Sequence, residues 1–133
     1  MALTNFTGLK ASIADFLNRD DLTSVIPDFV ALAEAQINRD IRHWKMEARS
    51  SGQQTNLDEY MQIPADWVET IRLHLTGSGT TVVNLVSRDA MADKRSANEN
   101  ATGTPRVYTH ADSQFQLYPT PNATIDFELL YYQ

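Results

Sequence analysis

The side chains of this 133-residue sequence that could do chemistry are three histidines and three pairs of carboxylates. His43, His74 and His110 fall on a predicted helix, a predicted strand and a predicted turn, and none of them forms a helical pair at metal-ligand spacing. Cysteine is absent, which excludes thiolate metal sites and disulfides. We therefore favour three unrelated histidines and predict neither a metal ion nor another cofactor.

The carboxylate pairs could serve glycoside hydrolysis in principle. Asp126 and Glu128 are two residues apart on a predicted strand, which places their carboxylates about 7 Å apart. Catalysis would also require a cleft that raises one pKa, whereas a solvated strand face explains the alternation without it. For the other two pairs, Asp58 with Glu59 and Asp66 with Glu69, we likewise favour a structural role over a catalytic one. The sequence has no phosphate-binding loop and no nucleophile elbow, so we predict that the protein is not an enzyme.

A cluster of basic residues stands out in a chain whose formal net charge is −6. Arg39, Arg42, Lys45 and Arg49 would share one face near the end of a long predicted helix, where positive charge complements the helix dipole. We favour a solvated helix face, and the alternative is a surface that meets an acidic partner or phosphates. Trp44 would close the apolar stripe of that helix, so its first interpretation is a core residue.

The last predicted strand offers the second candidate surface. Ile125, Phe127, Leu129 and Tyr131 would share one face, and Leu130 and Tyr132 would lie on the other with the two acids. Exposed aromatic residues are frequent in protein interfaces. The candidate partner-binding residues are therefore Arg39, Arg42, Trp44, Arg49, Leu130 and Tyr132.

The elements that must position these residues begin with two helices. Thr7 is a plausible N-cap for a helix that runs to Asn18, and residues 19–24 form a polar connector. Pro27 suits the first turn of a second helix, which Ser50-Ser-Gly52 would end. Its narrow apolar stripe steps by three or four residues through Ile26, Val30, Ala33, Ile37, Ile41 and Trp44.

Residues 53–133 have the period of β-strands, with one helical interruption. We predict strands at 60–63, 71–75, 81–86, 106–109, 114–118 and 124–132, a short helix at 88–94 capped by Ser87, and an exposed loop at 95–103. The fold class is α+β: a helical pair followed by a mostly antiparallel β-region with a short helix inserted. We expect one domain, 1–133, with a helical part, 1–52, and a β-rich part, 53–133.

The final strand runs into the last residues without a turn or cap, so we interpret it as an edge strand that pairs with something else or belongs to a longer chain. No apolar run approaches the roughly 20 residues of a membrane helix, and the start lacks the features of a secretory signal. The acidic charge argues against general nucleic-acid binding.

An ordered series of short motifs resembles the head-to-tail adaptor proteins of short-tailed bacteriophages. The series is Ile26-Pro-Asp-Phe-Val-Ala-Leu-Ala-Glu-Ala-Gln-Ile-Asn-Arg39, Met46-Glu-Ala-Arg49, Ile63-Pro-Ala-Asp-Trp67, Gly103-Thr-Pro-Arg-Val-Tyr108 and Leu117-Tyr-Pro-Thr-Pro121. The resemblance covers nearly the whole chain. The family usually continues past the strand that ends here at Tyr132 into further helices.

The resemblance implies a structural virion protein at the head–tail junction, present in the host cytoplasm during assembly. Such adaptors form a ring, commonly a dodecamer, between the portal and the tail nozzle or tail fibre proteins, and genomic DNA passes through it. Two alternatives remain open: a tail module that binds or cleaves glycans through Trp67, Asp66 and Glu69, and a DNA-binding regulator that uses the basic cluster.

Overall fold

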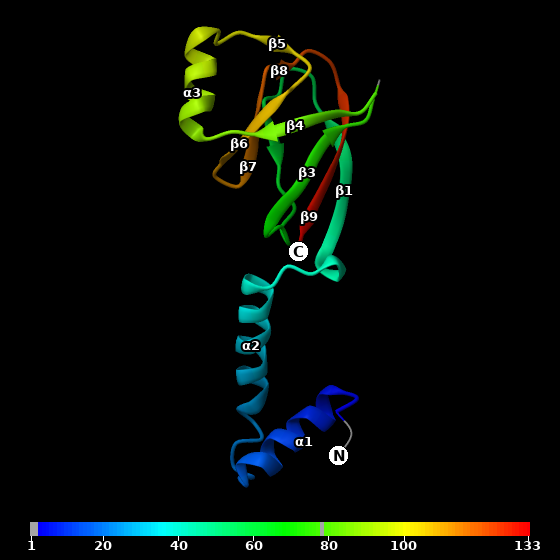
Figure 1. Cartoon of the computed structure of the whole chain (residues 1–133), viewed down its shortest axis with the longest axis vertical. Coiled ribbons are helices and arrows are strands. Elements are labelled where there is room, and N and C mark those ends of the chain that lie inside the picture. Colours follow the sequence, from blue (N-terminus) through cyan, green and yellow to red (C-terminus); the bar gives the residue numbers. More distant parts are fainter. Residues whose placement is uncertain (1–2, 78) are drawn as a thin grey trace. The chain divides into compact units, whose positions relative to one another are not determined.

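A computed structural model describes residues 3–77 and 79–133 of the chain (Figure 1). The predicted α+β class is confirmed: within the described residues a helical pair precedes nine mostly antiparallel strands, with a third helix inserted among them. The chain forms two compact units, a helical unit at residues 1–42 and a β unit at residues 43–133. A single domain over the whole chain stays a prediction.

Two helices make up the helical unit. Helix α1 is Phe6–Leu17, and the Asn5 side chain caps it by accepting a hydrogen bond of 2.7 Å from the Gly8 N–H. The predicted cap at Thr7 was therefore wrong by two residues. Asn18 ends α1 in the left-handed conformation, as an amide residue at that position tolerates. Helix α2 is Ile26–Asp40 and carries Pro27 in its first turn, as predicted.

The predicted extension of the second helix to Gly52 was wrong. Helix α2 ends at Asp40, Ile41 and His43 are extended, and a single 3₁₀ turn, η1 (Trp44–Met46), leads into strand β1 (Glu47–Gln54). Residues 47–54 hydrogen-bond along their full length to β9 (Ile125–Tyr132), about 80 positions later in the chain. Ser50, Ser51 and Gly52 have little helix propensity, and this distant pairing decides their conformation.

The strands of the β unit form a seven-stranded sheet in the order β1-β9-β3-β4-β6-β7-β2 and a separate parallel pair, β5 with β8. The remaining strands are β2 (Tyr60–Gln62), β3 (Glu69–Leu75), β4 (Thr81–Leu85), β5 (Thr102–Gly103), β6 (Val107–Ala111), β7 (Gln114–Tyr118) and β8 (Thr120–Pro121). The predicted hairpin is confirmed as the antiparallel pair β3 and β4. Ser78 in its turn lies outside the described residues.

The inserted helix α3 is Arg88–Ala97, and the Ser87 side chain caps it as predicted. The predicted loop at 95–103 was wrong at both ends, because α3 continues to Ala97 and β5 begins at Thr102. A register shift between Thr70 and Arg72 interrupts the pairing of β3 with β9. Ile71 lies at this shift and is 40% exposed. Strict alternation along the strand would have buried it on the same face as Leu73 and Leu75.

The last strand is not at an edge of the sheet. Strand β9 pairs antiparallel with β1 on one side and with β3 on the other (Figure 1). The interpretation of residues 124–132 as an edge strand was wrong, because the pattern within a strand shows which face is buried but not which strands flank it. The predicted faces of this strand are consistent with the burial of Leu129 and Tyr131.

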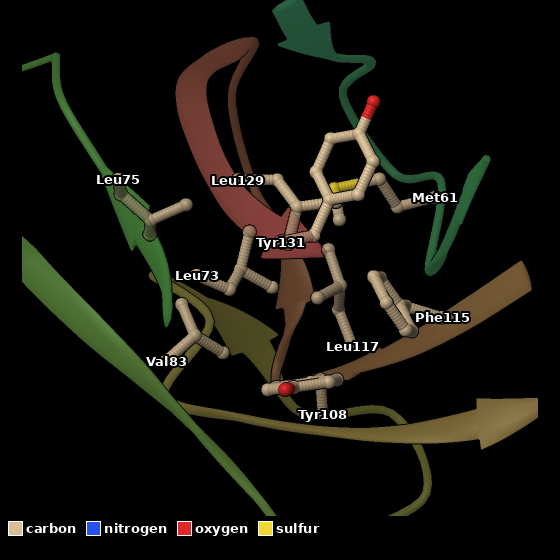
Figure 2. Packing of buried hydrophobic residues seen from close by; sticks show 9 residues of the cluster. All are labelled: Met61, Leu73, Leu75, Val83, Tyr108, Phe115, Leu117, Leu129 and Tyr131. Atoms are coloured by element: carbon tan, nitrogen blue, oxygen red, sulfur yellow. The ribbon is translucent and has the colours of Figure 1, made fainter. Parts of the chain in front are cut away.

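One hydrophobic cluster forms the core of the β unit (Figure 2). Strand β2 at one end of the sheet order and β9 near the other end both contribute to it, so the sheet curves around the cluster. Phe115 is completely buried, and its ring lies 4.9 Å from that of Tyr108 and 5.9 Å from that of Trp67. The cluster consists of Met61, Leu73, Leu75, Val83, Tyr108, Phe115, Leu117, Leu129 and Tyr131.

Candidate interaction surfaces

The helical unit leaves most of its apolar side chains exposed. Among the described residues of α1 and α2, Ile26 is the one that is buried. Phe16 is 90% exposed and Leu32 is 68% exposed. The other exposed apolar side chains of the two helices are Phe6, Leu17, Phe29 and Ile37, followed by Ile41 just after α2. An apolar surface of this extent on short helices is typical of a protein-binding site.

The basic residues do not share a helix, contrary to the prediction. Arg39 lies in the last turn of α2, Lys45 lies in η1, and Arg49 lies on β1. Arg39 is exposed, with its Nε 3.5 Å from Asp40 Oδ1. Arg42 follows α2 and donates hydrogen bonds of 3.0 and 2.9 Å to the carbonyl oxygens of Asn38 and Arg39. Arg42 therefore satisfies carbonyls that the helix end leaves unpaired.

Trp44 is exposed, so its first interpretation as a core residue was wrong. Its side chain leaves 68% of its surface accessible. The His43 ring lies 5.5 Å away, and the Lys45 ammonium lies 5.5 Å from the centre of the indole. Since the helix ends before Trp44, the apolar stripe that would have buried it stops at Ile37 within α2.

The outer face of β1 and β9 carries a polar network. Glu128 lies 3.4 Å from Arg49 Nη1 through one oxygen and 3.6 Å from His74 Nε2 through the other. Gln53 donates a hydrogen bond of 2.8 Å to Asp126. Both carboxylates of this pair are thus engaged on the face of the sheet, and the partner-binding candidates Leu130 and Tyr132 lie half-buried on the same strand.

The residues of the proposed glycan module are engaged within the fold as well. The Tyr131 hydroxyl donates to Asp66 at 2.9 Å, and the Trp67 indole N–H donates to the Thr70 hydroxyl at 3.0 Å. The Trp67 ring packs on the rings of Phe115 and His110. Nothing in this geometry favours an exposed sugar-stacking platform.

A cavity of about 570 Å³ lies beside α3 and is lined by Tyr60, Arg88, Met91, Arg95, His110 and Gln116, among others. Arg95 Nη1 lies 2.6 Å from Glu59 Oε2, and Arg95 Nη2 donates to the Leu117 carbonyl oxygen at 2.9 Å. Arg88 donates to the His110 carbonyl oxygen at 3.0 Å. Burial lowers the pKa of His110, and the nearby Arg88 guanidinium lowers it further.

The described residues contain no cluster of histidine and carboxylate side chains that could hold a metal ion. Sequence reasoning missed the ion pair between Glu59 and Arg95, because no local pattern joins residues that far apart in the chain. In the described ranges, no helix has the length and apolar character needed to cross a membrane.

Comparison with known families is consistent with the ordered motifs. The profile of the family described as SU10 adaptor protein matches residues 4–133. The chain therefore belongs to this family of phage head–tail adaptors, whose members are structural components of the virion. The predicted resemblance to phage adaptors is confirmed. No curated protein matches the chain.

Proposed function

We propose that this member of the SU10 adaptor family is the subunit of a ring that connects the phage portal to the tail and lets genomic DNA pass. The observation that carries the proposal is the helical unit, in which α1 and α2 bury few of their apolar side chains against each other. A structural adaptor must present surfaces of this kind, because its function is to be bound by other virion proteins.

The energetics of the helical unit support this assignment. Helices of 12 and 15 residues are marginal in water unless tertiary packing stabilises them. Burial of apolar surface contributes about 25 cal/mol per Å², and α1 and α2 bury little apolar surface against each other. A neighbouring copy or the portal would supply the missing contacts, so we propose that the apolar face of α2 docks there.

Ring assembly requires two different patches on each subunit, one for each neighbour. The helical unit supplies one patch, and the exposed side chains near the start of the β unit supply candidates for another. We propose Arg39, Arg42, Trp44, Arg49, Leu130 and Tyr132 as contacts to neighbouring copies, to the portal, or to tail nozzle or tail fibre proteins. A ring of twelve copies at the head–tail junction, assembled from chains in the host cytoplasm, is the arrangement that the family resemblance implies.

The charge of the chain is compatible with a DNA passage. The formal net charge of −6 opposes general attraction to the phosphates of DNA. A channel that lets DNA slide benefits from weak attraction to the backbone.

A charge placed in the apolar face of α2 tests the proposal. Ile37 is the last residue of the apolar stripe within α2 and is 51% exposed, so Ile37→Glu should leave the free protein folded. We expect it to weaken binding to the purified portal protein at least about tenfold, which corresponds to about 1.4 kcal/mol. The measurements are sedimentation of the mixture and electron microscopy of the rings.

The matched control is Ala35→Glu. Two residues from Ile37, the Ala35 side chain points about 160° away around the helix, and it is exposed. It adds the same charge to the same helix and should leave assembly unchanged. Equal assembly by wild type and Ile37→Glu, or a wild-type chain that never joins the portal, would overturn the proposal.

A further inference from the structure

The two edges of the seven-stranded sheet differ in how their main-chain groups are satisfied. Strand β1 forms one edge and β2 forms the other. A free edge presents unpaired N–H and C=O groups and therefore serves as a template for another strand. The state of these groups decides which edge can accept a strand.

The pairing of β1 with β9 shows which groups of β1 are free. The Gln133 N–H donates to the Met46 carbonyl oxygen at 2.9 Å. In an antiparallel pair, alternate residues direct both main-chain groups to the partner, so Ala48, Ser50, Gly52 and Gln54 face β9. The main-chain groups of Glu47, Arg49, Ser51 and Gln53 therefore point away from β9, and in the described chain no strand pairs with them. The Glu47 N–H is the exception among the free groups, because it donates to the Trp44 carbonyl oxygen.

At the opposite edge, side chains form hydrogen bonds with the outward main-chain groups of Tyr60 in β2. Strand β2 is only three residues long. The N–H of Tyr60 donates to Asp58 Oδ1 at 3.0 Å, and its carbonyl accepts from Gln54 Nε2 at 3.0 Å. The Gln54 side chain also donates to the Asp58 carbonyl at 2.7 Å, and it is almost completely buried. The outward groups of Tyr60 are thus unavailable to a second chain.

Strand β1 lacks the features that usually protect an edge. It runs for eight residues in unbroken register with β9, without a bulge, and contains neither proline nor lysine. Its one arginine, Arg49, leans toward Glu128 on the neighbouring strand. Protected edges in natural sheets are short, bulged, covered, or carry proline or lysine.

We propose that β1 is a self-complementary edge, which pairs antiparallel with β1 of a second copy about a two-fold axis at Ser50. In this register Glu47 lies opposite Gln53 of the other copy, and Arg49 lies opposite Ser51. The Glu47 N–H already donates to the Trp44 carbonyl oxygen, so the four outward residues of each copy give about six main-chain hydrogen bonds. No like charges face each other directly.

The two registers whose axis lies nearer the start of β1 are worse. An axis at Arg49 sets the two arginines against each other, and like charges directly opposite destabilise a strand pair. An axis at Ala48 opposes Glu47 to Arg49 but leaves Ser51 and Gln53 without a strand partner, because η1 precedes β1. We choose β1 of a second copy as the partner strand for two reasons. Among the described strands, β1 is the one with a long open edge, and its outward residues are complementary to those of a second β1.

The proposed contact between two β1 strands does not depend on the proposed ring. A two-fold contact uses the same patch on both copies, whereas ring neighbours use two different patches. The β1 pair therefore describes the free chain before assembly, when an open edge would otherwise recruit other strands. Either proposal can fail while the other stands.

Proline at an outward position tests the pairing. Ser51→Pro removes an N–H that points to the open edge, so the ladder to β9 remains while the new strand pair is blocked. We expect analytical ultracentrifugation of the purified protein to show a dimer for wild type and a loss of association of at least about tenfold for this variant. Ser51→Thr keeps the N–H and should dimerise as wild type does.

Two outcomes would overturn the pairing through β1. The first is a wild-type protein that stays monomeric at concentrations up to about 1 mM, the upper range in which weak contacts are seen. The second is a dimer that Ser51→Pro leaves intact. If Ile37→Glu abolishes that dimer, the association belongs to the helical unit.

Cross-linking tests the register even where Ser51→Pro affects folding. Because the chain contains no cysteine, single cysteines can be placed without background. Copies with Arg49→Cys mixed with copies carrying Ser51→Cys should form the mixed disulfide several-fold more than either variant forms its own. Equal yields in the three mixtures would rule out the axis at Ser50.

Discussion

The β unit buries a cluster of apolar side chains, whereas the helical unit leaves most of its large ones exposed. In the β unit, Phe115, Leu73 and Leu129 are 1% exposed or less and belong to one continuous cluster. In the helical unit, Phe16 and Leu32 are mostly exposed and one residue of the two helices is buried. The first unit carries its own core, whereas the second exposes most of its large apolar side chains, which is the surface that we propose as a docking site.

The β unit contributes most of the folding stability of this chain, and the helical unit contributes most of the surface that we propose for recognition. The sheet buries nine apolar side chains in one cluster, and burial of apolar surface is the main favourable term in folding. The pair of short helices buries one of its described residues, so its other apolar positions are free to serve recognition. Mutations in the two units should therefore separate cleanly into effects on folding and effects on assembly.

The largest effect that sharpens this contrast comes from truncating one phenylalanine in each unit. Phe115→Ala removes a fully buried ring, and we expect it to lower the free energy of unfolding by about 3–5 kcal/mol. Phe16→Ala removes a ring that is 90% exposed, and we expect a change within about 0.5 kcal/mol. Urea denaturation of the full chain measures both, and comparable losses would break the comparison.

A smaller effect is expected at the end of α2. Arg42→Ala removes the donor that satisfies the carbonyls of Asn38 and Arg39. The loss should destabilise the last turn by about 0.3–1 kcal/mol and reduce the helical signal in far-ultraviolet circular dichroism. The urea midpoint of the β unit should stay where it is, and a midpoint that moves with the helical signal would show that the two units unfold together.

The smallest effect is a pH dependence confined to the β unit. Because the pKa of His110 is lowered below its ordinary value of 6.5, the unfolded chain takes up a proton more readily than the folded one. The stability that neutral His110 contributes is present above pH 6.5 and is lost as the pH falls through the folded pKa. His110→Gln should flatten this part of the curve of unfolding free energy against pH.

Urea denaturation between pH 5 and pH 8 checks the expectation, a range that brackets the ordinary histidine pKa of about 6.5. The groups that face His110 are Arg88 and the rings of Trp67, Tyr108 and Phe115. Identical slopes for wild type and His110→Gln over this range would contradict a lowered pKa.

Local signals in the sequence determined much of the architecture. The positions of α1 and α3, the proline that opens α2 and the β3–β4 hairpin all follow from caps, periodicity and turn residues. These features depend on residues within a few positions of each other, which is why they could be predicted. The ordered motifs likewise indicated the adaptor family without any spatial information.

Tertiary structure alone decided the conformation of residues 41–54 and the position of the last strand in the sheet. Arg49 and Trp44 fit an apolar and basic helix by local pattern, but pairing with β9 makes β1 a strand and leaves Trp44 exposed. The same pairing moves residues 125–132 from a predicted edge to the interior of the sheet, so the open edge is β1. The physical reason is that strand neighbours are set by hydrogen bonds between segments far apart in the chain, which no local period encodes.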